Sequence, residues 1–247
     1  MHVRLVRGDI TGPQLRAVAA LALEFGDGGV RTSNQQNLIV RWVPVDLLPA
    51  VYARLADVGL ALPGAERLLD VTSCPGADTC QLGITSSRGL ALALSEMIER
   101  DLPDLADAPD LRIKISGCPN SCGQHHIAAI GLFGGARKFN GEQAPTYQLL
   151  IGARLSSEAP RYGKPLARIP AKEVPEAVKT LLVLYRSERA EGEAFHAFVD
   201  RIGHERLAAV VEPWTELPSP ADAPDKYIDW GADQRFTVET GPGECAA

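Results

Sequence analysis

The spacing of apolar and polar positions predicts a compact unit of helices and strands at the start of the chain. Apolar side chains recur every three or four positions over residues 11–25, which is typical of an amphipathic helix. The segment VRTSNQQNLIVRWV (30–43) has the β-branched content and the alternation of a strand. A second helix is predicted over residues 46–58, where Gly59 terminates it. With HVRLVR as an opening strand, these elements make a β-α-β-α unit.

The remainder of the chain continues to alternate helices and strands. The predicted segments are, in order, a helix over 85–102, strands over 111–116, 127–135 and 146–155, and helices over about 172–190 and 194–211. The glycine-rich segment GLFGGARKFNG (131–141) is interpreted as a turn, because it lacks the order of a phosphate-binding loop. The tail from Pro213 is rich in proline and aspartate and is expected to run irregularly.

Composition and charge narrow the class of protein. The chain has 247 residues, of which 45% are apolar and 23% charged, so it can bury the core of a globular protein. The net charge is -6 and the basic residues are scattered, which argues against nucleic acid as a partner. The sequence shows neither an apolar run of membrane-spanning length nor a signal peptide. We therefore expect a cytoplasmic protein without a membrane partner.

Four of the five cysteines form two close pairs. Cys74 and Cys80 follow the pattern C-x5-C, and Cys118 and Cys122 follow the pattern C-x3-C after a long gap. Since the cytoplasm keeps thiols reduced, metal binding is favoured over a disulfide framework. The first pair is too wide for most structural zinc sites, and four thiolates from two loops suit a 4Fe-4S cluster. Structural zinc and four unrelated buried thiols remain alternatives, and Cys245 has no partner at a useful spacing.

Four segments together resemble one half of a known enzyme family. They are VRTSNQQNLIV (30–40), CPGADTCQLGITSSRGLA (74–91), KISGCPNSCGQHHIAAIGLFG (114–134) and YQLLIGARL (147–155). Over about residues 3–155 the chain is similar to the C-terminal half of the nitrite and sulfite reductase haemoproteins. The resemblance implies an α+β fold: a ferredoxin-like half domain at 1–66, a mixed α/β domain binding a 4Fe-4S cluster and sirohaem at 67–212, and an irregular tail at 213–247.

The resemblance also implies roles for the cysteines. Cys74, Cys80, Cys118 and Cys122 correspond to the cluster ligands, and Cys122 corresponds to the thiolate that also bridges to the sirohaem iron. Asn120 lies between the last two cysteines, where it favours a tight turn whose backbone amides point toward the cluster sulfurs.

Polar residues outside the cysteine loops are candidates for binding the haem. Arg31, Asn34, Gln36 and Asn37 match the family's R-T-x-x-Q-N motif near sirohaem, although a polar strand edge with a surface ion pair is the alternative. Sirohaem carries eight carboxylates, so Lys114, Arg112 and Arg41 are candidate cations; an exposed strand edge explains the first two equally well.

Two adjacent histidines follow the second cysteine pair. His125 and His126 invite a role in proton delivery, because each reduction consumes protons. We favour the simpler interpretation that at least one of them forms a hydrogen bond within the turn.

The function implied by the resemblance is six-electron reduction of sulfite to sulfide or of nitrite to ammonia. The expected partners are a small anion, an electron donor such as ferredoxin or a flavoprotein, and a companion chain that supplies the family's first half. That half carries the cations that hold the substrate, so this chain alone is expected to be an incomplete enzyme, either a fragment or one subunit of a split enzyme. The alternative is a small single-half sulfite reductase that carries sirohaem and cluster on one short chain. A further alternative is an electron-transfer iron-sulfur module without its own substrate site.

Overall fold

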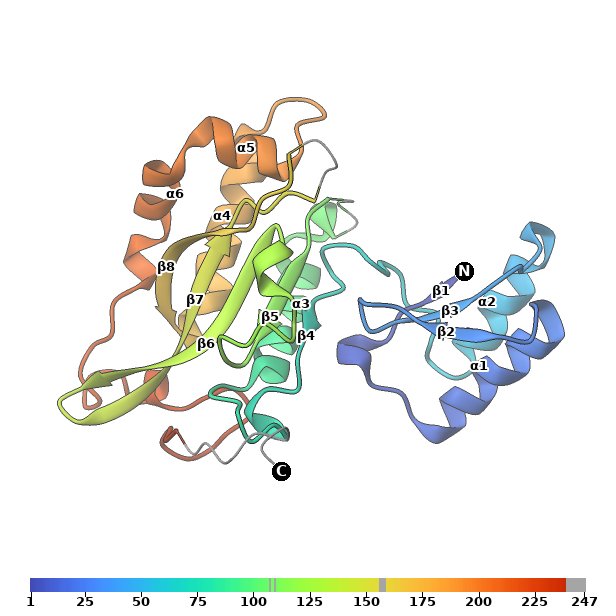
Figure 1. The fold of residues 1–247 in the computed structure, drawn as a ribbon, viewed down its shortest axis with the longest axis horizontal. Coiled ribbons are helices and arrows are strands. Elements are labelled where there is room, and N and C mark those ends of the chain that lie inside the picture. Colours follow the sequence, from blue (N-terminus) through green and yellow to red (C-terminus); the bar gives the residue numbers. More distant parts are fainter. Residues whose placement is uncertain (107, 109, 156–158, 239–247) are drawn as a thin grey trace.

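A computed structural model of the chain describes residues 1–106, 108, 110–155 and 159–238. Cys245 lies outside the described residues, as does the end of the tail. The chain folds into two parts, each with its own hydrophobic core, which lie side by side in Figure 1. No helix in the described part of the chain is long and apolar enough to cross a membrane.

The N-terminal part is a small antiparallel sheet with two helices packed against it (Figure 1). Its elements are β1 (His2–Val3), α1 (Gly12–Phe25), β2 (Val30–Thr32), β3 (Leu38–Val40) and α2 (Leu48–Ala56). The strand order is β1-β3-β2. Val18 and Leu21 of α1 meet Val51 and Leu55 of α2 in the core, because each pair lies on one face of its helix.

The structure confirms the first helix and corrects three neighbouring predictions. Segment 30–43 is a hairpin and not one strand, because the N–H of Ser33 donates to the Asn37 carbonyl at 2.8 Å and closes a turn. The opening strand is only β1, since a 3-10 turn follows at Val6–Gly8. The second helix begins at Leu48, after a 3-10 turn, and has a proline in its first turn.

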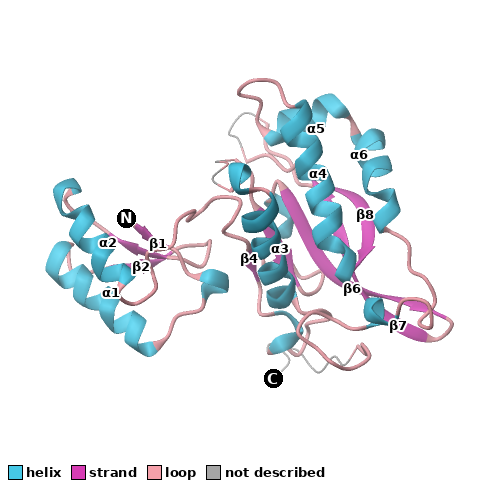
Figure 2. Cartoon of the chain, turned by 180° about the vertical axis from the view of Figure 1, so that it is seen from behind, coloured by secondary structure: helices cyan, strands magenta, loops and turns pink. Residues whose placement is uncertain are grey.

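The larger part is a five-stranded sheet covered by helices, seen from the opposite side in Figure 2. Its elements are β4 (Thr72–Ser73), α3 (Ser87–Asp101), β5 (Ile113–Ser116), β6 (Ile130–Phe139), β7 (Glu142–Ile151), β8 (Lys164–Pro170), α4 (Val174–Glu188), α5 (Phe195–Ile202) and α6 (His204–Val211). The strand order is β4-β5-β6-β7-β8. The pairs β4/β5 and β5/β6 are parallel, and β6/β7 and β7/β8 are antiparallel.

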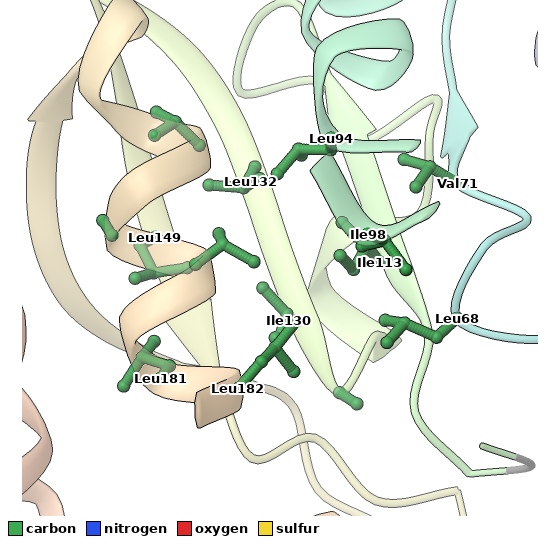
Figure 3. Close-up of a cluster of buried hydrophobic side chains, with 14 of the residues drawn as sticks. Leu68, Val71, Leu94, Ile98, Ile113, Ile130, Leu132, Leu149, Leu181 and Leu182 are labelled. Atoms are coloured by element: carbon green, nitrogen blue, oxygen red, sulfur yellow. The ribbon is translucent and has the colours of Figure 1, made fainter. Parts of the chain in front are cut away.

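Helices α3 and α4 bury the core of this part against the sheet, as Figure 3 shows. Leu94 and Ile98 of α3 and Leu182 of α4 are fully buried, and they pack with Ile113 and Ile130 of the strands. Burial of one such side chain contributes about 1.5–3 kcal/mol to stability. The sheet beneath the cysteine loops is therefore firmly held.

The structure also corrects predictions in the larger part. Most of GLFGGARKFNG belongs to β6, and the reversal comes only at residues 140 and 141, where Gly141 has a φ of +90°. Strand β8 was not predicted; its two prolines are tolerated because it lies at the sheet edge. The helix expected over 194–211 is broken at Gly203, whose φ is +84°.

A buried polar cluster joins the two parts. Arg4 donates to the carbonyl oxygens of Pro63 (3.0 Å) and Leu69 (2.8 Å), and its Nε lies 3.6 Å from Asp70. The Asn37 side chain donates to Asp70 at 2.6 Å and accepts from the N–H of Leu5 at 2.9 Å. These contacts fix the hairpin β2–β3 to the segment that leads into β4.

Candidate metal centre

The two cysteine pairs meet because their strands are parallel neighbours. Cys74 directly follows β4, and Cys118 follows β5 by two residues. Helix α3 makes the crossover between these strands, so both carboxyl ends lie at the same edge of the sheet, which is where α/β proteins commonly bind ligands. Pairs that are far apart in sequence therefore lie in adjacent loops.

Backbone hydrogen bonds hold the two loops together. The N–H of Gly117 donates to the Cys74 sulfur at 3.1 Å, and the N–H of Cys74 donates to the Ile115 carbonyl at 3.0 Å. The Gly117 carbonyl in turn accepts from the N–H groups of Ile84 and Thr85 at 2.9 and 3.0 Å. Each loop thus fixes the backbone of the other.

Glycines allow this close approach. A Cβ at Gly117 would lie 2.7 Å from the Cα of Gly76 and 2.6 Å from the Thr85 carbonyl oxygen. A Cβ at Gly134, in the strand beneath, would lie 2.4 Å from the Gly117 carbonyl oxygen. Contacts this short exclude any side chain, so the sequence needs glycine at both positions.

The four paired cysteines carry free thiols in one neighbourhood. Cys74 and Cys118 are buried, Cys80 is partly buried and Cys122 is exposed. Burial raises the pKa of the Cys118 thiol, the N–H of Asn120 lowers it, and the thiols of Cys74, Cys122 and Cys80 raise it further. Because burial and the neighbouring thiols disfavour ionisation of Cys118, a bound metal would favour its thiolate form.

The chemistry of the donor set fits a 4Fe-4S cluster. Four thiols from two adjacent loops are the ligand type that such clusters use.

The turn after Cys118 is held by Ser116. The Ser116 hydroxyl accepts from the N–H of Gly123 at 3.1 Å and lies 2.8 Å from Nδ1 of His125. Ser121 and Gln124 have positive φ values of 62° and 61°, which turn the chain tightly around Cys122. The hydrogen bond predicted for one histidine is confirmed at His125, and burial lowers its pKa to about 4.

The candidate cations near the turn differ in their surroundings. Lys114 is buried and donates to the Gln124 side chain at 3.1 Å. Burial lowers the pKa of Lys114, and the neighbouring Arg112 lowers it further. Arg112 is only partly exposed and lies 3.8 Å from Glu66. Arg41 is paired with Asp27 inside the N-terminal part.

The four candidate haem-binding residues of the β2–β3 hairpin fall into two groups. Arg31 and Asn34 are exposed, and their side chains make no hydrogen bond or ion pair with another described residue. The side chains of Gln36 and Asn37 use all their polar atoms on the protein: Gln36 contacts the backbone of Ser73, and Asn37 contacts Asp70 and Leu5.

The tail contributes residues that the sequence did not indicate. Asp229 is buried and its carboxylate accepts from the N–H of Ser86 at 2.7 Å, at the start of α3. Asp229, Trp230 and Cys80 line a cavity of about 420 Å³. Because 143 residues separate Asp229 from Ser86, no local sequence signal could have revealed the contact.

Comparisons with known proteins define the class. Residues 64–217 match the family model described as nitrite and sulphite reductase 4Fe-4S domain, and residues 1–58 match the nitrite/sulfite reductase ferredoxin-like half domain. The chain belongs to this nitrite and sulfite reductase family. The predicted α+β fold and the 4Fe-4S cluster are thereby confirmed at the level of the family, and sirohaem stays a prediction.

Some of the relatives are named as nitrite reductases and others as sulfite reductases. The chain is 28% identical to an assimilatory ferredoxin-dependent nitrite reductase of Haloferax mediterranei over 207 residues, which are 83% of this chain and 35% of that protein. It is 28% identical to a ferredoxin–nitrite reductase of Synechococcus elongatus (74% and 35%) and to a sulfite reductase (ferredoxin) of Mycobacterium tuberculosis (82% and 37%). The chain thus spans about a third of the length of these relatives.

Solved structures agree with this assignment. The structure of the Mycobacterium tuberculosis NirA protein matches with a TM-score of 0.73 and 28% identity, covering 84% of this chain and 39% of that one. A dissimilatory sulfite reductase I, DsrI, matches with a TM-score of 0.68 over 94% of this chain and 75% of that one. Its identity of 13% supports the fold alone.

Proposed function

We propose that the chain is the cluster-bearing and sirohaem-bearing unit of a cytoplasmic reductase that converts sulfite to sulfide or nitrite to ammonia. The observation that carries the proposal is the convergence of Cys74, Cys80, Cys118 and Cys122 in two interlocked loops at the ends of β4 and β5. The names of the relatives support both anions as substrates and ferredoxin as a donor, while a flavoprotein donor remains an alternative.

In this proposal the four cysteines hold the cluster in unequal settings. Cys74 and Cys118 are buried, Cys80 is partly buried and Cys122 is exposed. The exposed Cys122 would therefore be the residue able to hold a haem as well as the cluster. The N–H of Asn120 points toward the Cys118 sulfur, where it stabilises the negative charge of the thiolate.

Candidate residues for an anionic cofactor lie on the β2–β3 hairpin and before the cysteine turn. A bound sirohaem and cluster would relay to the substrate, one at a time, the six electrons that an external donor such as ferredoxin supplies. The side chains of Arg31 and Asn34 make no hydrogen bond or ion pair with another described residue, so they are available to bind a haem carboxylate. Lys114 donates to Gln124 of the turn, and the positive charges of Lys114 and the neighbouring Arg112 would favour an anion there.

We propose that a companion chain completes the enzyme. The chain corresponds to about a third of each relative, and the family resemblance assigns the substrate-binding cations to the family's first half. Desolvating both sirohaem and an anionic substrate requires more positive charge than Arg31, Arg112 and Lys114 provide. The isolated chain should therefore assemble the cluster, bind sirohaem weakly and turn over slowly.

Anaerobic reconstitution of the purified chain tests this proposal. We expect about four irons and four sulfides per chain, and loss of most of the iron when Cys74, Cys80 or Cys118 is replaced by Ser. The matched control is Cys245→Ser, which should keep the wild-type iron content. Stoichiometric zinc without sulfide would refute the cluster.

Spectra and activity distinguish the complete enzyme from its alternatives. With sirohaem and a chain bearing the first half supplied, a reduced-viologen assay should show sulfite or nitrite reduction, and Cys122→Ser should uncouple the haem signal from the cluster in paramagnetic resonance. A cluster that never acquires haem, even with the companion chain, would indicate the electron-transfer module. Full sirohaem binding and rapid turnover by the isolated chain would contradict the need for a companion.

A further inference from the structure

The edge strand next to Cys74 is completed by a side chain from the other part of the molecule. Strand β4 is only Thr72–Ser73, and it pairs with β5 on one side. On its other side Nε2 of Gln36 donates to the Ser73 carbonyl at 2.7 Å, and the N–H of Ser73 donates to Oε1 of Gln36 at 3.2 Å. The carboxamide thus takes the place of a neighbouring strand and satisfies backbone groups that would otherwise be unpaired.

The Gln36 side chain is itself held in place. Gln36 occupies the left-handed region, with a φ of 66°, in the turn of the β2–β3 hairpin. Its N–H donates to the Ser33 carbonyl at 3.1 Å, and the next residue, Asn37, is anchored on Asp70. Gly8 packs on the other side, where a Cβ would lie 3.1 Å from the Cβ of Gln36. The amide therefore loses little freedom when it binds Ser73.

We infer that Gln36 is a positioning residue for the Cys74 thiolate, rather than a direct contact of the haem. Ser73 immediately precedes Cys74, whose own N–H is bound to the Ile115 carbonyl of β5. The segment is thus held from both sides, and its first anchor lies in the ferredoxin-like half domain. The inference rests on the proposed function, in which Cys74 is a cluster ligand. By this inference the ferredoxin-like half domain helps to orient one ligand of the cluster.

Two variants of Gln36 in the full chain test this inference. Gln36→Leu removes both hydrogen bonds, and Gln36→Glu keeps the size but replaces the donor by a charge that repels the Ser73 carbonyl. The controls are Gln35→Leu and Gln35→Glu in the same turn, because the Gln35 side chain bonds to no described residue. Circular dichroism of each apo chain checks that the fold is retained.

The readouts are amide exchange at Ser73 and the rate at which a chelator removes iron from the reconstituted cluster. Loss of the two bonds in Gln36→Leu should accelerate both by roughly tenfold, and Gln36→Glu should accelerate iron loss, while the Gln35 variants match the wild type. Changed g-values of the reduced cluster would mark an altered Cys74 ligand.

The outcomes separate this inference from the proposed function. If the wild-type chain takes up a cluster and the Gln36 variants release iron at the wild-type rate, the positioning role is wrong while the proposed function stands. Faster exchange at Ser73 with unchanged iron release also overturns it, because Gln36 would then order only the backbone. A wild-type chain that takes up no cluster overturns the proposed function and the positioning role together.

Discussion

Replacing Gly134 with Ala should separate the cysteine loops, and Gly135→Ala provides a matched control in the next position of β6. A Cβ at Gly134 would lie 1.9 Å from Oγ1 of Thr85 and 2.4 Å from the Gly117 carbonyl oxygen. Thr85 can rotate its hydroxyl away, but the Gly117 carbonyl is backbone. At Gly135 the nearest atom is Oγ1 of Thr146, at 3.8 Å, so a methyl group fits there.

The expected cost follows from these contacts. Forcing a methyl group into a packed site costs about 1–3 kcal/mol. Moving the Gly117 carbonyl also weakens its hydrogen bonds from the N–H groups of Ile84 and Thr85, each worth about 1 kcal/mol, and its longer bond from the Thr85 hydroxyl. We therefore expect Gly134→Ala to lower the free energy of unfolding by roughly 2–4 kcal/mol, while Gly135→Ala leaves it nearly unchanged or slightly higher.

Urea unfolding of the apo chain, followed by circular dichroism, measures the difference between the two variants. Iron content after reconstitution should fall in Gly134→Ala and stay at the wild-type level in Gly135→Ala, because only the first displaces the loop that carries Cys118. Equal stability and equal iron content in the two variants would show that the glycine packing does not hold the loops, and the reasoning would be refuted.

Two further predictions concern buried charge and pH. Asp70→Ala should lower the free energy of unfolding by about 3 kcal/mol, because it leaves Arg4 and Asn37 buried without their partner. The control Asp27→Ala removes an exposed ion pair and should change the free energy of unfolding little. Equal losses for the two variants in urea unfolding would contradict this prediction. The pKa of His125, about 4, lies below the pKa of a histidine in the unfolded chain. The apo chain should therefore lose up to about 3 kcal/mol of stability as pH falls from 6.5 to 4. This loss should persist in His126→Phe and disappear in His125→Phe.

The sequence carried enough information to predict two of the helices and to single out the two cysteine pairs. The apolar spacing over 11–25 and 85–102 predicted α1 and α3 to within two residues, because each helix buries a single face. The spacing of the cysteines was specific, since few structures need two thiol pairs at those intervals. The family match supports the cluster, and the roles of the individual cysteines remain predictions.

The failures arise where distant residues decide the local structure. The glycines of β6 were interpreted as a turn, but they are strand residues whose missing side chains make room for the cysteine loops. The hairpin in segment 30–43 was not predicted, because its turn uses Ser and Asn instead of Gly or Pro. The bonds from Gln36 to Ser73 join residues 37 positions apart, and no periodicity reports such a contact.

The α3 crossover also sets the order in which the centre can be built. During synthesis Cys74 and Cys80 emerge first, and they gain their partners only after α3 has formed and β5 has paired beside β4. A cluster bound by all four cysteines would then act as a cross-link that closes a loop of roughly 40 residues. By the chain-entropy relation for cross-links, such a closure is worth about 4 kcal/mol against unfolding. Binding of the cluster would therefore stabilise a folded topology that the polypeptide has already reached.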